Sequence, residues 1–133
     1  MINRRKAREH AFTLLFAYRF QPDSLKEMLQ DFFAAQDMGE QEDYIRTVVE
    51  GTVLHIEEID QKIERYAKGW TAERISAVCI TLMRLAVYEM LYMESIPATV
   101  SVNEAVALAK KFDGEESLSF VNGVLGHMKD AIE

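Results

Sequence analysis

One apolar stretch near the middle of the chain, residues 75–93, constrains the fold more than any other feature. It reads ISAVCITLMRLAVYEMLYM, and after its first two residues only Thr81, Arg84 and Glu89 are not apolar. A helix that is apolar on every side belongs inside a protein, and 19 residues make a rod of about 28 Å, the diameter of a small domain. Its polar interruptions argue against a membrane span. We therefore predict a central core helix surrounded by amphipathic helices.

The rest of the chain also has helical periodicity. Apolar residues recur at steps of three and four over residues 4–20, 24–33, 43–68, 101–112 and 117–128, and no run alternates with the period of a strand. Thr71 is expected to cap the central helix, Ser101 with Glu104 to open the next one, and Gly123 to mark close backbone approach. The sequence predicts an all-α, single-domain bundle of six or seven helices over residues 1–133; residues 43–68 form one helix or two.

The charge of the chain is unevenly distributed. The net charge is −7, yet residues 1–19 carry five basic side chains and one acidic, so that a basic arm precedes an acidic body. Such an arm can attract phosphate locally while the body repels it elsewhere. The single cysteine, Cys79, excludes an intramolecular disulfide and fits a reducing cytosol. The N-terminus lacks the apolar run of a secretory signal, and we expect a cytoplasmic protein.

Cationic and aromatic side chains share one flank of the first predicted helix. Arg5, Arg8, Phe12, Phe16 and Arg19 recur at three- and four-residue steps. Guanidinium groups attract phosphates, and aromatic rings stack on the bases of single-stranded nucleic acid. The stripe therefore indicates a nucleic-acid surface. The alternative, which spacing alone leaves open, is that the two phenylalanines widen the buried face while the arginines are solvated.

Signs of catalysis or of metal and cofactor binding are missing from the sequence. The three histidines have no HExxH, ExxH or CxxC partner, and no phosphate-binding glycine loop or GxSxG motif occurs. Glu89 is the one carboxylate on an otherwise apolar helix, and we interpret it as the acceptor of a structural salt bridge or hydrogen bond. We expect a protein that is not an enzyme and needs no metal and no cofactor.

Three blocks taken together resemble the NusB family of bacterial transcription antitermination factors. They are RRKAREHAFTLLFA near the N-terminus, ISAVCITLMRLAVYEML in the middle, and SVNEAVALAKKFDGEESLSFVNGVL near the end. The last block is the most specific, because NEAVxLAK, a short acidic loop and FVNGVL follow one another at the family's spacing. The resemblance covers residues 4 to about 128. It implies an all-helical domain with one helix surrounded by the others.

The resemblance also implies RNA binding without catalysis. Family members bind the boxA element of ribosomal RNA leader transcripts together with a ribosomal protein called NusE in this role, and join an RNA polymerase complex that suppresses termination. The residues of this chain that match the family's RNA-binding positions are Arg4, Arg5, Lys6, Arg8, Phe16, Tyr66 and Phe120. At Phe16 the family commonly has tyrosine, so stacking is kept and a hydroxyl is lost. Phe120 fits core packing equally well.

Two other interpretations stay open at this point. One is a helical protein–protein adaptor or homodimeric scaffold that binds no RNA, and the other is a stand-alone relative of the NusB-like domain that precedes RNA methyltransferase domains. Under the RNA-binding interpretation, replacing Arg5 and Arg8 by alanine is expected to weaken binding without changing the fold. Glu116, in the acidic loop before Phe120, is expected to repel the RNA.

Overall fold

A single helix, α5 (Ala77–Tyr92), forms the centre of the molecule. The computed structural model describes residues 1–132, which contain seven α-helices and no strand. The helices are α1 (Arg4–Tyr18), α2 (Leu25–Ala35), α3 (Glu42–Leu54), α4 (Ile56–Tyr66), α5, α6 (Ala98–Asp113) and α7 (Glu115–Ile132), with short 3₁₀ turns at Pro22–Ser24, Gly39–Gln41 and Ala72–Arg74. The predicted all-α bundle is confirmed.

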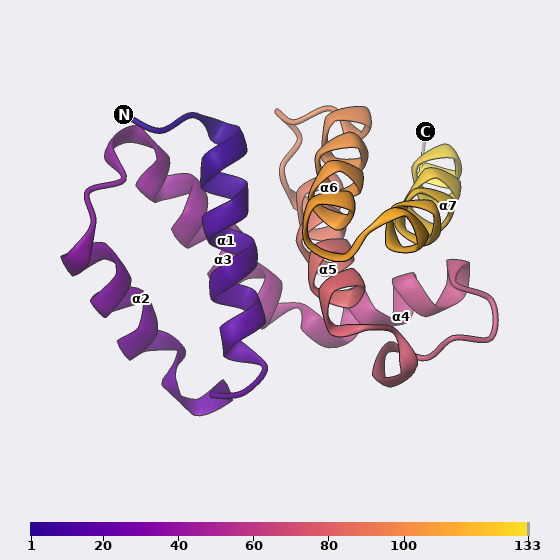
Figure 1. Ribbon diagram of the computed structural model, residues 1–133, viewed down its shortest axis with the longest axis horizontal. Coiled ribbons are helices and arrows are strands. Elements are labelled where there is room, and N and C mark those ends of the chain that lie inside the picture. Colours follow the sequence, from indigo (N-terminus) through magenta and orange to yellow (C-terminus); the bar gives the residue numbers. More distant parts are fainter. Residues whose placement is uncertain (133) are drawn as a thin grey trace.

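Every other α-helix except α2 packs on α5. Helices α1 and α3 cover one side of it and α4, α6 and α7 the other, so that in Figure 1 α5 lies between two groups of helices. Ile80, Leu82, Met83 and Val87 are fully buried, because α5 has no face that meets solvent along most of its length. The apolar run of residues 75–93 therefore forms the central helix, as predicted.

The structure decides one open alternative and differs from the sequence-based expectations at two helix starts. Residues 43–68 form two helices, α3 and α4, which meet at His55; this is one of the two arrangements that the sequence left open. Ser76 rather than Thr71 caps α5, because its Oγ accepts a hydrogen bond from the backbone N–H of Cys79 at 3.2 Å. Helix α6 begins at Ala98, directly after Pro97, so Ser101 lies inside the helix and is free to bond elsewhere.

Two glycines in helices have opposite surroundings. A Cβ on Gly51 in α3 would overlap the ring of Tyr88 in α5, so this glycine lets the two helices approach closely. A Cβ on Gly123 in α7 would meet nothing within 4 Å. The expectation of a close backbone contact at Gly123 is wrong, since periodicity shows that a glycine is in a helix but not which neighbour it faces.

Candidate nucleic-acid interface

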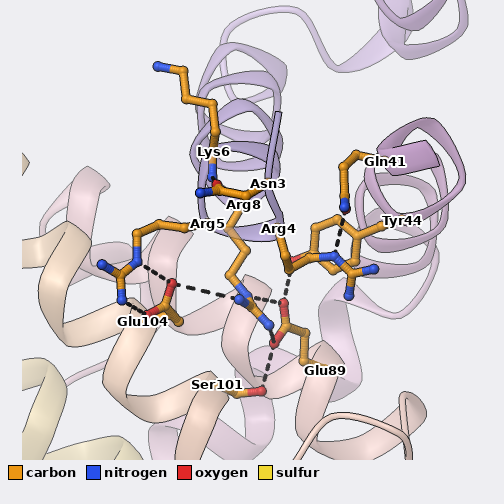
Figure 2. Close-up of polar contacts among 10 residues, drawn as sticks. All are labelled: Asn3, Arg4, Arg5, Lys6, Arg8, Gln41, Tyr44, Glu89, Ser101 and Glu104. Carbon is orange, nitrogen blue, oxygen red and sulfur yellow. Dashed lines mark hydrogen bonds and ion pairs between the residues drawn. The ribbon is translucent and has the colours of Figure 1, made fainter. Parts of the chain in front are cut away.

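Arg8 is buried in the core of the molecule. It is 6% exposed, and its Nε and Nη2 donate to Oε2 and Oε1 of Glu89 at 2.9 and 3.2 Å. Tyr44 donates its hydroxyl to the same carboxylate, and Ser101 donates its hydroxyl at 2.7 Å. Figure 2 shows the four side chains converging from α1, α3, α5 and α6. The expectation that Arg8 points outward with the cationic stripe is therefore wrong, and the structural interpretation of Glu89 is confirmed.

This buried network joins four helices through opposite charges and hydroxyl groups. Burial by itself lowers the pKa of Arg8, but the hydrogen bonds and charge of Glu89 outweigh it and raise that pKa. Burial, together with the neighbouring Glu89 charge, also raises the pKa of Tyr44 far above its ordinary value. The arginine is thus charged and the tyrosine neutral at every physiological pH, and the network fixes α1 against α5.

Arg4 lies on the flank of α1 that faces α3, opposite the flank that faces α6. Its Nε donates to Gln41 Oε1 at 2.7 Å, and its guanidinium lies 4.2 Å from the centre of the Tyr44 ring. Figure 2 shows Arg4 turned toward α3 while Arg5 turns toward α6. Arg4 therefore presents only part of its guanidinium to solvent, and the adjacent arginines do not form one continuous row.

Arg5 and Lys6 do point outward, with side chains 75% and 50% exposed. Arg5 donates from Nε and Nη2 to Glu104 on α6 at 3.1 and 2.9 Å. Lys6 donates to Glu9 at 3.1 Å, and so does Lys111 from α6 at 2.7 Å. The Arg5 and Lys111 contacts join α1 to α6, whereas the Lys6 contact lies within α1; part of each cationic group still faces solvent.

A cleft lined by aromatic rings lies between α1 and α6, next to the ion pairs of Arg5, Lys6 and Lys111. Phe12 is buried, Phe16 is half-buried, and Phe112 at the end of α6 is 40% exposed. The ring centres of Phe12 and Phe16 lie 5.9 Å apart and those of Phe12 and Phe112 lie 5.1 Å apart. With Thr13, Ala17 and Val78 they enclose a cleft of about 280 Å³. Both phenylalanines of the stripe thus line the cleft, Phe12 as a buried core residue and Phe16 as a half-buried one.

A second cleft lies on the other side of the N-terminal turn of α5. It measures about 240 Å³, and its lining includes Trp70, Cys79, Glu116 and Phe120. The rings of Trp70 and Phe120 meet edge to face with centres 6.0 Å apart. Phe120 therefore lies at the surface of a cleft and not wholly within the core.

Tyr66 lies apart from both clefts. It ends α4, and its ring centre is 6.1 Å from that of His127 on α7. The structure thus places Arg4, Arg5 and Lys6 at the outer end of α1 and Phe16 in the α1–α6 cleft. Phe120 lies in the second cleft and Tyr66 against α7, while Arg8 lies in the core. Val78 lines the first cleft and Cys79 the second, so the two clefts open beside the same turn of α5.

Sequence reasoning missed four residues at this surface: Trp70, Glu104, Lys111 and Phe112. Phe112 continues the apolar spacing of residues 101–112, which predicts a buried position, but it lies in the last turn of α6 and is 40% exposed. The pairing of Arg5 with Glu104 joins residues 99 positions apart, and no local pattern reveals such a contact.

Metal-binding groups and membrane-spanning helices are both absent from the described residues. Within residues 1–132, no group of three or more His, Cys, Asp or Glu side chains is placed to hold a metal ion. No helix in the described part of the chain is long and apolar enough to cross a membrane.

Comparison with known proteins identifies the family. The model of the NusB family matches residues 5–130. The chain belongs to the NusB family. The transcription antitermination protein NusB of Acetivibrio thermocellus is 45% identical over 126 residues, covering 94% of this chain and 87% of the relative. That of a Thermoanaerobacter species is 40% identical over 125 residues, covering 94% of this chain and 89% of the relative.

Solved NusB structures have the same fold. NusB of T. maritima superposes with a TM-score of 0.87 at 32% identity, over 97% of this chain and 92% of that one. A second solved structure is that of the antitermination factors NusB and NusE in complex with double-stranded RNA; its matching chain superposes with a TM-score of 0.86 at 28% identity over 96% of both chains. The resemblance drawn from the three sequence blocks is confirmed, and with it the assignment to a family of transcription antitermination proteins.

Proposed function

We propose that this chain is a transcription antitermination factor that binds boxA-type single-stranded RNA of ribosomal RNA leader transcripts together with NusE. It acts within an RNA polymerase antitermination complex, in the cytoplasm, and has no catalytic activity. The relatives are named transcription antitermination proteins, and one solved NusB has been crystallised with NusE and RNA. Residues 1–133 act as one RNA-binding domain.

The juxtaposition of exposed cations and a half-buried aromatic ring on α1 carries this proposal. Arg5 and Lys6 offer N–H groups to phosphates, and Phe16 offers an aromatic face to a base. Arg4 contributes the part of its guanidinium that faces solvent. Arg8 is not among the proposed RNA contacts, because its guanidinium is buried and paired with Glu89. The role of Arg8 is to hold α1 in place.

Phe120 and Tyr66 extend the proposed RNA path toward α7. The two clefts flank one turn of α5, so a strand that leaves Phe16 can pass this turn and reach Phe120. Glu116 lines the second cleft and carries a negative charge beside this path. Its repulsion of phosphate opposes binding.

A fluorescence-anisotropy titration tests the proposal. A labelled single-stranded boxA RNA is titrated with the protein at several salt concentrations, with and without NusE, beside a scrambled RNA. We expect preferential binding of boxA that tightens when NusE is added, because two weak sites on one RNA reinforce each other. Absence of RNA binding under all these conditions would leave the adaptor or homodimeric scaffold as the better explanation.

Charge-matched variants locate the site. Arg5→Ala with Lys6→Ala is expected to weaken binding roughly tenfold, or about 1.4 kcal/mol, and to reduce the salt slope by about 0.7 for each lost phosphate contact. Lys26→Ala with Lys62→Ala removes the same charge from α2 and α4 and serves as the control. Glu116→Gln is expected to tighten binding. Equal effects of the two double variants would mean that binding follows net charge and not this surface.

A further inference from the structure

The cleft between α1 and α6 has an unusual construction for a protein surface. Both helices pack on α5. Near the C-terminal end of α6, aromatic rings line the space between α1 and α6. The Phe12 and Phe112 rings are inclined at 39° with centres 5.1 Å apart, while Phe16 and Val78 form the other walls. Phe112 keeps 40% of its surface exposed. An aromatic ring left this open beside an unfilled apolar cleft is available to a ligand.

The walls of the cleft select the chemistry of that ligand. Thr13 is the one polar side chain in the lining, and its hydroxyl already donates to the carbonyl of His10 at 2.9 Å. The cleft therefore offers aromatic and aliphatic faces but little hydrogen bonding. A flat molecule that binds through its faces suits such walls, whereas a sugar or a charged group loses its hydration there without compensation.

Cations stand directly beside this apolar cleft. The Nζ of Lys111 lies 5.4 Å from the centre of the Phe112 ring and 2.7 Å from Glu9 on α1. Its neighbour Lys110 is also exposed, with a contact of 3.4 Å to Glu115. A flat group in the cleft that carries an anionic group a few ångströms away would satisfy both features, and a nucleotide in a single strand has this form.

We propose that one unstacked base of the RNA strand enters the cleft between Phe16 and Phe112, and that Lys111 binds a phosphate next to that base. This inference rests on the RNA binding proposed above, and it adds two residues of α6 to an interface otherwise built on α1, α4 and α7. Lys111 exchanges its contact with Glu9 for the phosphate. Since the lining offers stacking faces and little hydrogen bonding, the pocket accepts any of the four bases.

Fluorescent RNA tests the base pocket. A set of boxA oligonucleotides carries 2-aminopurine at one position each, and each is titrated with the wild-type protein and with Phe112→Ala. We expect one position whose fluorescence is strongly altered by the wild-type protein and much less by the variant. Loss of one stacked base is expected to weaken binding roughly 5- to 150-fold. Lys111→Gln should reduce the salt slope by about 0.7 without changing which position responds.

Two further variants keep the test decisive. Phe20→Ala removes an exposed ring of the same aromatic row that does not line the cleft, and it should bind like the wild type. Phe112→Leu keeps apolar bulk but has no aromatic face, so it replaces Phe112→Ala if that variant fails to fold, with the same expected loss. Wild-type affinity and an unchanged fluorescence profile in the Phe112 variants would overturn the base pocket while RNA binding stands. Failure of the wild-type protein to bind RNA would overturn both.

Discussion

Replacing Arg8 is the most informative test of how this structure is held together. Arg8→Met keeps an aliphatic side chain in the space but removes both N–H groups that reach Glu89. Glu89 is 1% exposed, so its negative charge would stay in the core with only the hydroxyl groups of Tyr44 and Ser101 as donors. Breaking a buried ion pair from one side typically costs about 3–5 kcal/mol. This is a large part of the roughly 5–15 kcal/mol by which proteins are stable.

Urea unfolding followed by circular dichroism measures this loss. With a slope of about 2 kcal/mol per molar urea, the midpoint of Arg8→Met is expected to fall by roughly 1.5–2.5 M. Arg5→Ala serves as the control on the same helix, because its side chain is mostly in solvent, and its midpoint should stay close to that of the wild type.

A second substitution distinguishes an unpaired charge from lost packing. Glu89→Gln in the wild-type background should destabilise the protein, because Arg8 then loses its counter-charge. In the Arg8→Met background the same change should restore part of the stability, because it removes the orphaned carboxylate. If Glu89→Gln lowers the midpoint equally in both backgrounds, or if Arg8→Met unfolds like the wild type, the reasoning is refuted.

Two other predictions follow from local contacts. Gly51→Ala is expected to destabilise the protein by about 1–3 kcal/mol, because its Cβ would displace the Tyr88 ring, whereas Gly123→Ala should add up to about 1 kcal/mol through helix propensity. Thermal unfolding checks both, and a stabilising Gly51→Ala would contradict the close packing of α3 on α5. Hydrogen bonding by Lys111 lowers the pKa of Glu9 from its ordinary 4.5. The stability that Glu9 contributes is therefore complete above this value and lost as the pH falls through the lowered pKa. Urea midpoints of wild type and Glu9→Gln should differ at pH 7, and this difference should shrink as the pH falls below 4.5; a constant difference would refute the assignment.

The architecture and the family could be predicted from the order of the amino acids. Residues 75–93 are apolar on all sides and can be stable only when surrounded, and the periodicity of the flanking segments shows which faces surround them. These are properties of residues close in the chain, so local spacing is enough to recognise them. The structural role of Glu89 also followed from the sequence, whereas spacing alone left open whether Phe16 is buried or exposed.

Which charged residues remain available to a partner depends on contacts between helices that are far apart in the chain. Arg5 and Arg8 occupy one helix flank, yet Arg8 is neutralised inside the core by Glu89, 81 residues away, while Arg5 stays in solvent against Glu104. An arginine at the border of an apolar helix face turns into the core when a buried carboxylate can pair with it, and it turns toward solvent when no such carboxylate is within reach. The positions of such partners depend on how distant helices pack, and for this reason Phe112 and Lys111 became visible as parts of the proposed interface only in the folded molecule.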